Sequence, residues 1–116
     1  MTIKLYGIKN CDTVKKTLNW LDSHGISYDF HNYKKQGLDD AAFQTAIDQH
    51  GWDIIINKRG TSWRQLDEAT KNNVNDDNAI TIARDNPSLV KRPLLIKDGI
   101  VYVGFKEKDY KEIFSI

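Results

Sequence analysis

The strongest constraint on the fold is the order of hydrophobic periodicities in the first 31 residues. Residues 3–7 alternate between apolar and polar types and stop at a glycine, which predicts a short strand. A helical spacing follows in Val14, Leu18 and Leu21. Residues 26–31 alternate again, as a strand with one buried face does. A strand, a helix and a strand in this order predict two parallel strands joined by a right-handed crossover.

The ends of this helix can also be predicted. Gly25 supplies a C-terminal stop. We expect Asp12 or Thr13 to be the N-cap, because either side chain can accept a hydrogen bond from the amides of the first turn. Cys11 therefore falls in a loop between the end of a strand and the start of a helix.

The C-terminal part of the chain returns to β structure. Two apolar runs, 94–96 and 100–103, flank Asp98-Gly99, which is the strongest short-range signal for a β-hairpin. A closing helix is expected over residues 108–114. Its inward-facing residues would be Tyr110, Ile113 and Phe114.

Residues 37–90 predict a helical insertion between these two β-containing parts. Helical segments are expected over residues 42–50, 61–69 and 79–83, with one more turn at Asn86-Pro87. Residues 71–78 are polar and read as a loop, while the isoleucine run 54–56 fits either a strand or a buried helical turn. The order β-α-β, helical insertion, β-β-α predicts a single α/β domain over residues 1–116, with a mixed sheet of about four strands.

Composition excludes several classes of protein. The chain has 116 residues, of which 40% are hydrophobic and 28% charged, as in ordinary globular domains. A formal net charge of +1 argues against direct binding of nucleic acid or of anionic membranes. No apolar run is long enough to span a bilayer, and the N-terminus has no signal-like apolar segment. We expect a cytoplasmic monomer.

The chain contains one cysteine, Cys11, so an intrachain disulfide and a cysteine-rich zinc site are excluded. A helix N-terminus stabilises a thiolate through its unpaired amides and its dipole, and Lys9 and Lys15 add positive charge nearby in sequence. The competing interpretation is a small buried apolar residue. The histidines show no metal-ligand spacing, so no metal is expected; they are His24, His31 and His50.

Two further motifs are compatible with an anion site, although each has a simpler interpretation. Arg92-Pro93 directly precedes a predicted strand, and from local sequence alone Arg92 reads as a solvated surface arginine. Residues 58–62 combine a basic pair, a glycine and two hydroxyls before a helix. Such a turn can hold a carboxylate or another oxyanion, or it can be an exposed basic turn with a helix cap.

Three segments together resemble the ArsC/Spx family, and more narrowly its YffB-like branch of small arsenate-reductase-related proteins. They are residues 6–13 (YGIKNCDT), 57–60 (NKRG) and 91–94 (KRPL). The resemblance extends over essentially the whole chain. It implies a thioredoxin-like fold in which Pro93 is the cis-proline and Cys11 is the nucleophile. It also implies that Arg59 and Arg92 hold an oxyanion beside the cysteine.

The sequence departs from the arsenate reductases at several of these positions. Lys106 stands where the resemblance would place a third arginine, and lysine lacks the planar, bidentate guanidinium. Gly7 and Val14 occupy the positions of a histidine and a serine, and Asp12 replaces a glycine. Val14 also occupies the place of the second cysteine of the Spx redox switch, so this chain cannot form that switch.

The resemblance and the single thiol lead to a hypothesis of a glutathione-dependent thiol reductase. Cys11 would attack an oxidised sulfur or a small anionic substrate, and glutathione or glutaredoxin would resolve the intermediate. Arg59 and Arg92 would lower the pKa of the thiol and bind carboxylates. Secondary substrate contacts are expected from Lys9, Asn10, Thr13, Pro93 and Lys106. No bound cofactor is expected.

Two alternatives remain open at this point. One is a non-enzymatic, Spx-like regulator that binds RNA polymerase, for which Trp20, Trp52 and Trp63 could form an exposed contact patch. The other is true arsenate reduction, which the missing third arginine makes the weakest hypothesis.

Overall fold

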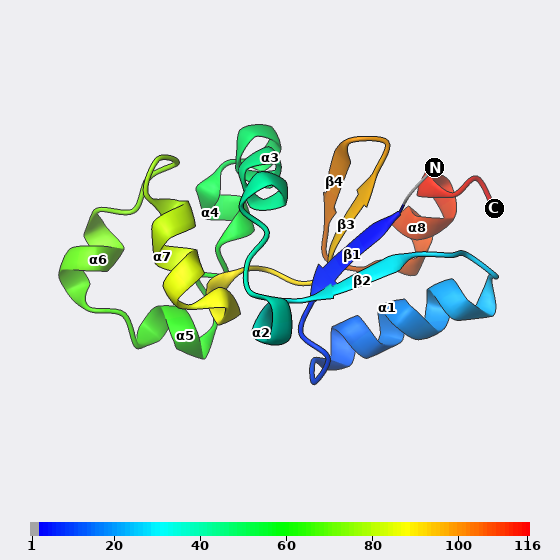
Figure 1. Ribbon diagram of the computed structural model, residues 1–116, viewed down its shortest axis with the longest axis horizontal. Helices are drawn as coiled ribbons and strands as arrows, with labels where there is room; N and C mark the ends of the chain where they lie inside the picture. Colours follow the sequence, from blue (N-terminus) through cyan, green and yellow to red (C-terminus); the bar gives the residue numbers. More distant parts are fainter. Residues whose placement is uncertain (1–2) are drawn as a thin grey trace. The chain divides into compact units, whose positions relative to one another are not determined.

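A computed structural model describes residues 3–116, with the side chain of Lys34 excepted (Figure 1). Met1 and Thr2 lie outside the described residues. They belong to the predicted domain and to the N-terminal segment that we expected not to be a signal sequence. The described residues divide into two compact units, one formed by residues 3–32 and 92–116 and the other by residues 33–91. The single-domain organisation over residues 1–116 stays a prediction.

The first unit contains a four-stranded mixed sheet in the order β2-β1-β3-β4. Its strands are β1 (Lys4–Gly7), β2 (Asp29–Asn32), β3 (Leu94–Lys97) and β4 (Ile100–Val103). Strand β1 pairs in parallel with β2 and antiparallel with β3, and β3 pairs antiparallel with β4. This confirms the predicted parallel pair and the predicted hairpin. The arrangement is that of a thioredoxin-like fold.

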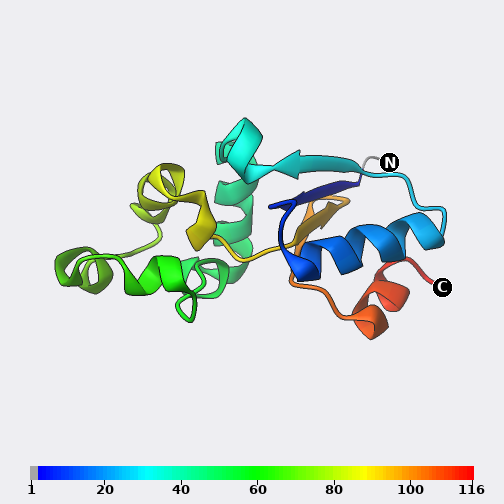
Figure 2. The same cartoon turned by 90° about the horizontal axis from the view of Figure 1, so that it is seen from below.

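Helices α1 (Asp12–Ser23) and α8 (Glu107–Ile113) pack against one face of this sheet (Figure 2). Leu5 and Leu95 are directly opposite each other in the β1–β3 register, and both are fully buried in the same hydrophobic cluster as Trp20 of α1 and Tyr110 of α8. The rings of Trp20 and Tyr110 meet edge to face, with centroids 5.6 Å apart. Trp20 is therefore a core residue, which corrects the expectation that it contributes to an exposed patch.

The N-cap of α1 is Cys11, and not Asp12 or Thr13 as the sequence suggested. Cys11 has an extended backbone with φ −95° and ψ 127°, and its carbonyl accepts the first helical hydrogen bond, from Lys15 N–H at 2.9 Å. The error arose because a cysteine has no side-chain oxygen to reveal its capping position. Gly25, with φ +68°, ends the helix as predicted.

Strand β2 is shorter than the predicted strand and begins at Asp29. Ile26 and Tyr28 still pack against the core as predicted, but they lie before the first ladder position, Lys4↔Asp29. The hairpin turn is confirmed in detail: Asp98 and Gly99 both have positive φ, 56° and 78°, as a type I′ turn requires.

The second unit is mostly helical, as predicted. It contains α2 (Tyr33–Gln36), α3 (Asp40–His50), α4 (Trp52–Ile55), α5 (Thr61–Arg64), α6 (Glu68–Asn72), α7 (Ala79–Asp85) and the 3₁₀ turn η1 (Pro87–Leu89). Asp39 caps α3 by accepting the N–H of Ala42 at 3.2 Å. No helix among residues 3–116 is long and apolar enough to cross a membrane.

The isoleucine run 54–56, for which the sequence allowed either a strand or a helical turn, contains both kinds of structure. Ile55 ends α4, while Ile56 forms an isolated antiparallel bridge with Val90. The expected helix over residues 61–69 is wrong in extent, because α5 ends at Arg64 and α6 begins at Glu68. Part of the expected loop over residues 71–78 correspondingly belongs to α6.

The buried hydroxyl of Tyr110 yields a test of this core. Its Oη has no hydrogen-bond partner within the described residues, and burial raises the pKa of the phenol well above its usual range. Tyr110→Phe removes an unsatisfied polar atom and keeps the ring, so we expect the free energy of unfolding to rise by about 1 kcal/mol. Urea denaturation measures the change.

Tyr28→Phe is the matched control, because the Tyr28 hydroxyl donates a hydrogen bond to Asp22 Oδ1 at 3.0 Å. That variant should be neutral or slightly less stable than the wild type. A loss of stability in Tyr110→Phe as large as in Tyr28→Phe, or larger, would mean that the Tyr110 hydroxyl is satisfied in solution.

Candidate active site

Cys11 lies where β1 gives way to α1. After Gly7 the chain makes a tight turn, closed by a hydrogen bond from Cys11 N–H to Ile8 O at 3.2 Å. The thiol is half-buried. It is thus accessible to a reaction partner and still close to the amides of the first helical turn, as the sequence predicted.

Opposing effects act on the pKa of the Cys11 thiol. Partial burial is the largest single effect and raises the pKa, because it disfavours the charged form. The N–H of Val14, the guanidinium of Arg92 and the N–H of Thr13 all lower it, and together they outweigh burial. The net result is a thiol with a pKa below its ordinary value, so more of it is thiolate at neutral pH.

Arg92 reaches this thiol from the other end of the sequence. It precedes Pro93 through a cis peptide bond, and Pro93 is buried beside the start of β3. The Pro93 carbonyl accepts the N–H of Gly104 at 2.9 Å, which ties the segment to the end of β4. Arg92 both donates a hydrogen bond to Cys11 and acts on it as a charge, so it is not merely a solvated surface arginine.

Gly7 and Val14 form a close-packed apolar contact beside these groups. Val14 is fully buried, and a Cβ placed on Gly7 would lie 2.9 Å from Val14 Cγ2 and 3.8 Å from the Cβ of Arg92. Glycine is thus the side chain that lets the end of β1, the first turn of α1 and the Arg92 segment approach one another. The sequence marked Gly7 as the end of a strand, but nothing in it revealed this contact.

The predicted secondary contacts are distributed around the loop. Lys9 and Asn10 are exposed in the turn before Cys11. Thr13 acts through its backbone: its N–H favours the thiolate, while its carbonyl accepts the hydroxyl of the fully buried Thr17 at 2.7 Å. The roles of these residues in binding a substrate stay predictions.

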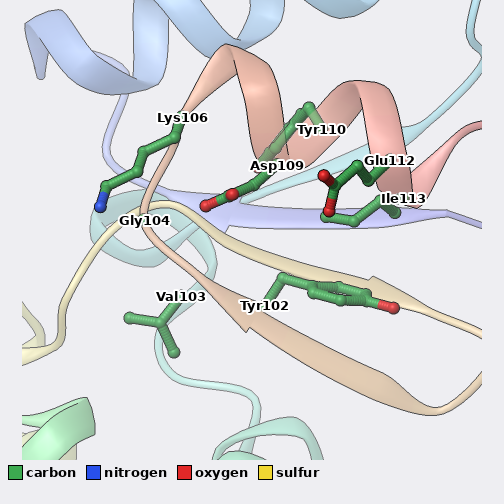
Figure 3. Close-up of a pocket in the computed structure, with 8 residues that line it drawn as sticks. All are labelled: Tyr102, Val103, Gly104, Lys106, Asp109, Tyr110, Glu112 and Ile113. Carbon is green, nitrogen blue, oxygen red and sulfur yellow. The ribbon is translucent and has the colours of Figure 1, made fainter. Parts of the chain in front are cut away.

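Lys106 is exposed at the N-cap of α8, at the edge of a cavity of about 420 Å³ between β4 and α8. Figure 3 shows the side chains of Asp109 and Glu112 projecting from α8, with the Asp109 carboxylate on the side of Lys106. Two carboxylates beside one ammonium group disfavour an anion in this cavity. The predicted contribution of Lys106 to anion binding stays a prediction, and the geometry of this cavity gives it no support.

Arg59 belongs to the second unit, and its catalytic role at Cys11 stays a prediction. Its own loop is well defined. The N–H of Arg59 donates to Asn57 Oδ1 at 3.2 Å, and its carbonyl accepts Arg64 Nη2 at 2.9 Å. Within residues 3–116 no group of three or more His, Cys, Asp or Glu side chains is placed to hold a metal ion.

Comparison with known proteins identifies the family of the chain. The sequence model of the ArsC family matches residues 6–113. The chain belongs to the ArsC family. An uncharacterised protein of Haemophilus influenzae is 47% identical over 113 residues, which cover 97% of this chain and 99% of that protein. A solved structure of a YFFB protein has a TM-score of 0.91 at 44% identity, covering 96% of this chain and 97% of the other.

The ArsC-family chain is also similar to a class of regulators. The global transcriptional regulator Spx 2 of Oceanobacillus iheyensis is 28% identical over 119 residues, covering 97% of this chain and 83% of the regulator. Both the family and the fold implied by the three sequence motifs are thus confirmed.

Replacement of Arg92 tests the electrostatics of this ArsC-family site. Arg92→Gln removes the charge and leaves a hydrogen-bonding side chain, so the pKa of the Cys11 thiol should rise. Because iodoacetamide reacts with the thiolate, the rate of alkylation at neutral pH should fall several-fold, and its pH profile should move to higher pH.

Lys9→Gln is the control for this experiment, since it removes a nearby exposed charge that does not contact the thiol. Its alkylation profile should stay close to that of the wild type. Equal shifts in the two variants would show that the general positive charge of the region controls the thiol, and not the Arg92 contact.

Gly7→Ala tests the close approach of the three segments. The added methyl group would press on Val14, and such overpacking typically costs about 1–3 kcal/mol of folding free energy. The pKa of Cys11 should rise as well, because Arg92 and the Val14 N–H are displaced. Chemical denaturation and alkylation kinetics measure the two effects.

The double variant Gly7→Ala/Val14→Ala should be more stable than the sum of the two single changes predicts, because the smaller side chain makes room for the methyl group. If the stability changes of the two single variants simply added up in the double variant, the strain caused by the Gly7 methyl group would not come from its contact with Val14.

Proposed function

We propose that this ArsC-family protein is a thiol reductase in which Cys11 is the nucleophile and glutathione or glutaredoxin supplies the resolving thiol. The observation that carries the proposal is the lowered pKa of a half-buried but accessible Cys11, produced by Arg92 and the amides of Thr13 and Val14. Structural cysteines are normally inert and lack such activation. A reducing, cytoplasmic environment would keep this unpaired thiol available, and the protein would act there as a monomer.

The first step is an attack by the Cys11 thiolate on one sulfur of an oxidised substrate disulfide. A bond forms between Cys11 Sγ and that sulfur, the substrate S–S bond breaks, and the other sulfur leaves as a thiolate. Arg92, which already faces Sγ, is positioned to bind a carboxylate of the substrate or of glutathione. In this proposal Arg59 would provide a second guanidinium for the same carboxylates.

The second step needs a thiol from another molecule, because the chain contains one cysteine. A glutathione thiolate attacks the substrate sulfur of the mixed disulfide, and Cys11 leaves as a thiolate. A second glutathione then attacks the substrate–glutathione disulfide. Each substrate disulfide thus gains two electrons and two protons, while two glutathione molecules become one glutathione disulfide. Glutaredoxin would replace glutathione in the resolving step.

Intact mass spectrometry provides the main test. After incubation with glutathione disulfide, the wild type should gain the mass of one glutathionyl group, and reduced glutathione should remove it. Arg92→Gln should form the adduct several-fold more slowly at neutral pH, because less of its Cys11 is thiolate. Failure of the wild type to form the adduct would overturn the proposal.

Cys11→Ser is the matched control, since it removes the thiol with little change in volume and should form no adduct. This variant also distinguishes the second candidate function, which the similarity to Spx 2 favours: a regulator that binds RNA polymerase. If the α subunit of RNA polymerase is retained equally by the wild type and by Cys11→Ser while no glutathione adduct forms, the regulator is the better description. Turnover of arsenate with glutathione and glutaredoxin would instead identify an arsenate reductase.

A further inference from the structure

Two tryptophans of the second unit stack on each other while remaining accessible to solvent. Trp52 begins α4 and Trp63 lies in α5, and their ring centroids are 6.2 Å apart at an interplanar angle of 25°. Both residues are half-buried, so part of each indole stays in contact with water. Ile54, two residues after Trp52, is 43% exposed. Apolar side chains are thus partly exposed on this part of the chain.

Three cations lie near these tryptophans in the sequence: Lys58, Arg59 and Arg64. Lys58 Nζ lies 5.4 Å from the centroid of the Trp52 ring, in a cation–π contact. Arg59 follows Lys58 in the chain, and Arg64 is joined to Arg59 by the bond from its Nη2 to the Arg59 carbonyl at 2.9 Å. We call Trp52, Lys58, Trp63 and Arg64 the Trp52–Trp63 patch.

The positive charge of the patch is not neutralised by ion pairs. Residues 56–66 contain these three cations and no aspartate or glutamate. None of the three forms an ion pair with a carboxylate within residues 3–116, whereas Arg84 and Asp40 in the same unit do so at 2.6 Å. Asp76, the carboxylate in contact with Trp52, accepts that residue's backbone N–H at 3.0 Å.

We infer that the Trp52–Trp63 patch is a docking surface for an acidic segment of a partner protein, with apolar side chains between its carboxylates. Tryptophan and arginine are the residues that most often dominate binding energy at protein interfaces. The indoles would receive the apolar side chains, while Lys58 and Arg64 would pair with the carboxylates. The inference concerns the second unit alone and does not depend on the chemistry of Cys11.

A nucleic acid is the other polyanion that could stack on exposed tryptophans. The rest of the chain argues against it, because sixteen acidic residues bring the formal net charge to +1. A chain with this balance of charges lacks the excess of basic residues that forms the extended positive surface on which phosphate binding depends. A local basic and aromatic patch in an otherwise neutral protein matches a short acidic segment better than a long polyanion.

Fluorescence anisotropy of a labelled peptide that alternates glutamate and leucine over about twelve residues tests the inference with the intact chain. The peptide should bind with an affinity that falls as salt is added. Lys58→Glu and Arg64→Glu should each weaken binding by about tenfold or more, as expected for charge reversal within an interface. Trp63→Ala should weaken it similarly, and the two charge variants keep the test valid if that substitution disturbs folding.

Lys35→Glu is the matched control, because it makes the same charge change at an exposed position of α2 in the same unit. It should bind the peptide as the wild type does. A loss in Lys35→Glu equal to that in Arg64→Glu would overturn the inference by showing a non-specific charge effect. Absence of peptide binding, or tighter binding of an oligothymidylate of equal charge, would overturn it as well.

Discussion

The pairing of β1 with β3 is the constraint on which the candidate site depends. Tyr6 lies opposite Leu94 in the antiparallel register, and therefore the residue after Tyr6 meets the residue before Leu94. Gly7 thus arrives beside the Arg92-Pro93 segment, and the turn that follows Gly7 brings Cys11 within reach of the guanidinium. A slip of one residue would place Leu5 and Leu95 on opposite faces of the sheet, so burial of both in the hydrophobic cluster and the lowered pKa of the thiol require the same register.

The apolar contact behind the thiol shows how a chemical site is supported by ordinary packing. Val14 provides a backbone N–H to the sulfur while its side chain fills the space that Gly7 leaves open. The side chain therefore holds the amide in place, and the amide favours the thiolate. Thr17 adds a further restraint one turn along the helix, through its bond to the Thr13 carbonyl.

Much of this architecture could be predicted because local signals are strong where the chain turns. The hairpin turn needs positive φ values at Asp98 and Gly99, and aspartate and glycine are residues that tolerate such values. The hydrophobic periodicities in the sequence locate helices α1 and α3. Long-range contacts could not be derived in this way. Arg92 resembles a surface residue until the register of β3 is known, and Trp20 differs from Trp52 in burial but not in any local pattern. The position of Arg92 beside the cysteine was predicted from the family resemblance, and not from the residues that neighbour Arg92 in the sequence.

The first unit is discontinuous in sequence, since residues 33–91 are inserted between its two segments. Protein synthesis is directional, so Cys11 is added to the chain well before Arg92. At usual elongation rates of about 5–20 residues per second, the delay is on the order of 4–16 s. A nascent chain thus carries its thiol without the guanidinium that favours the thiolate, and is correspondingly less prone to premature oxidation. The Arg92 contact that lowers the pKa of the thiol forms only after the segment containing Arg92 has been made, which links stabilisation of the thiolate to completion of the fold.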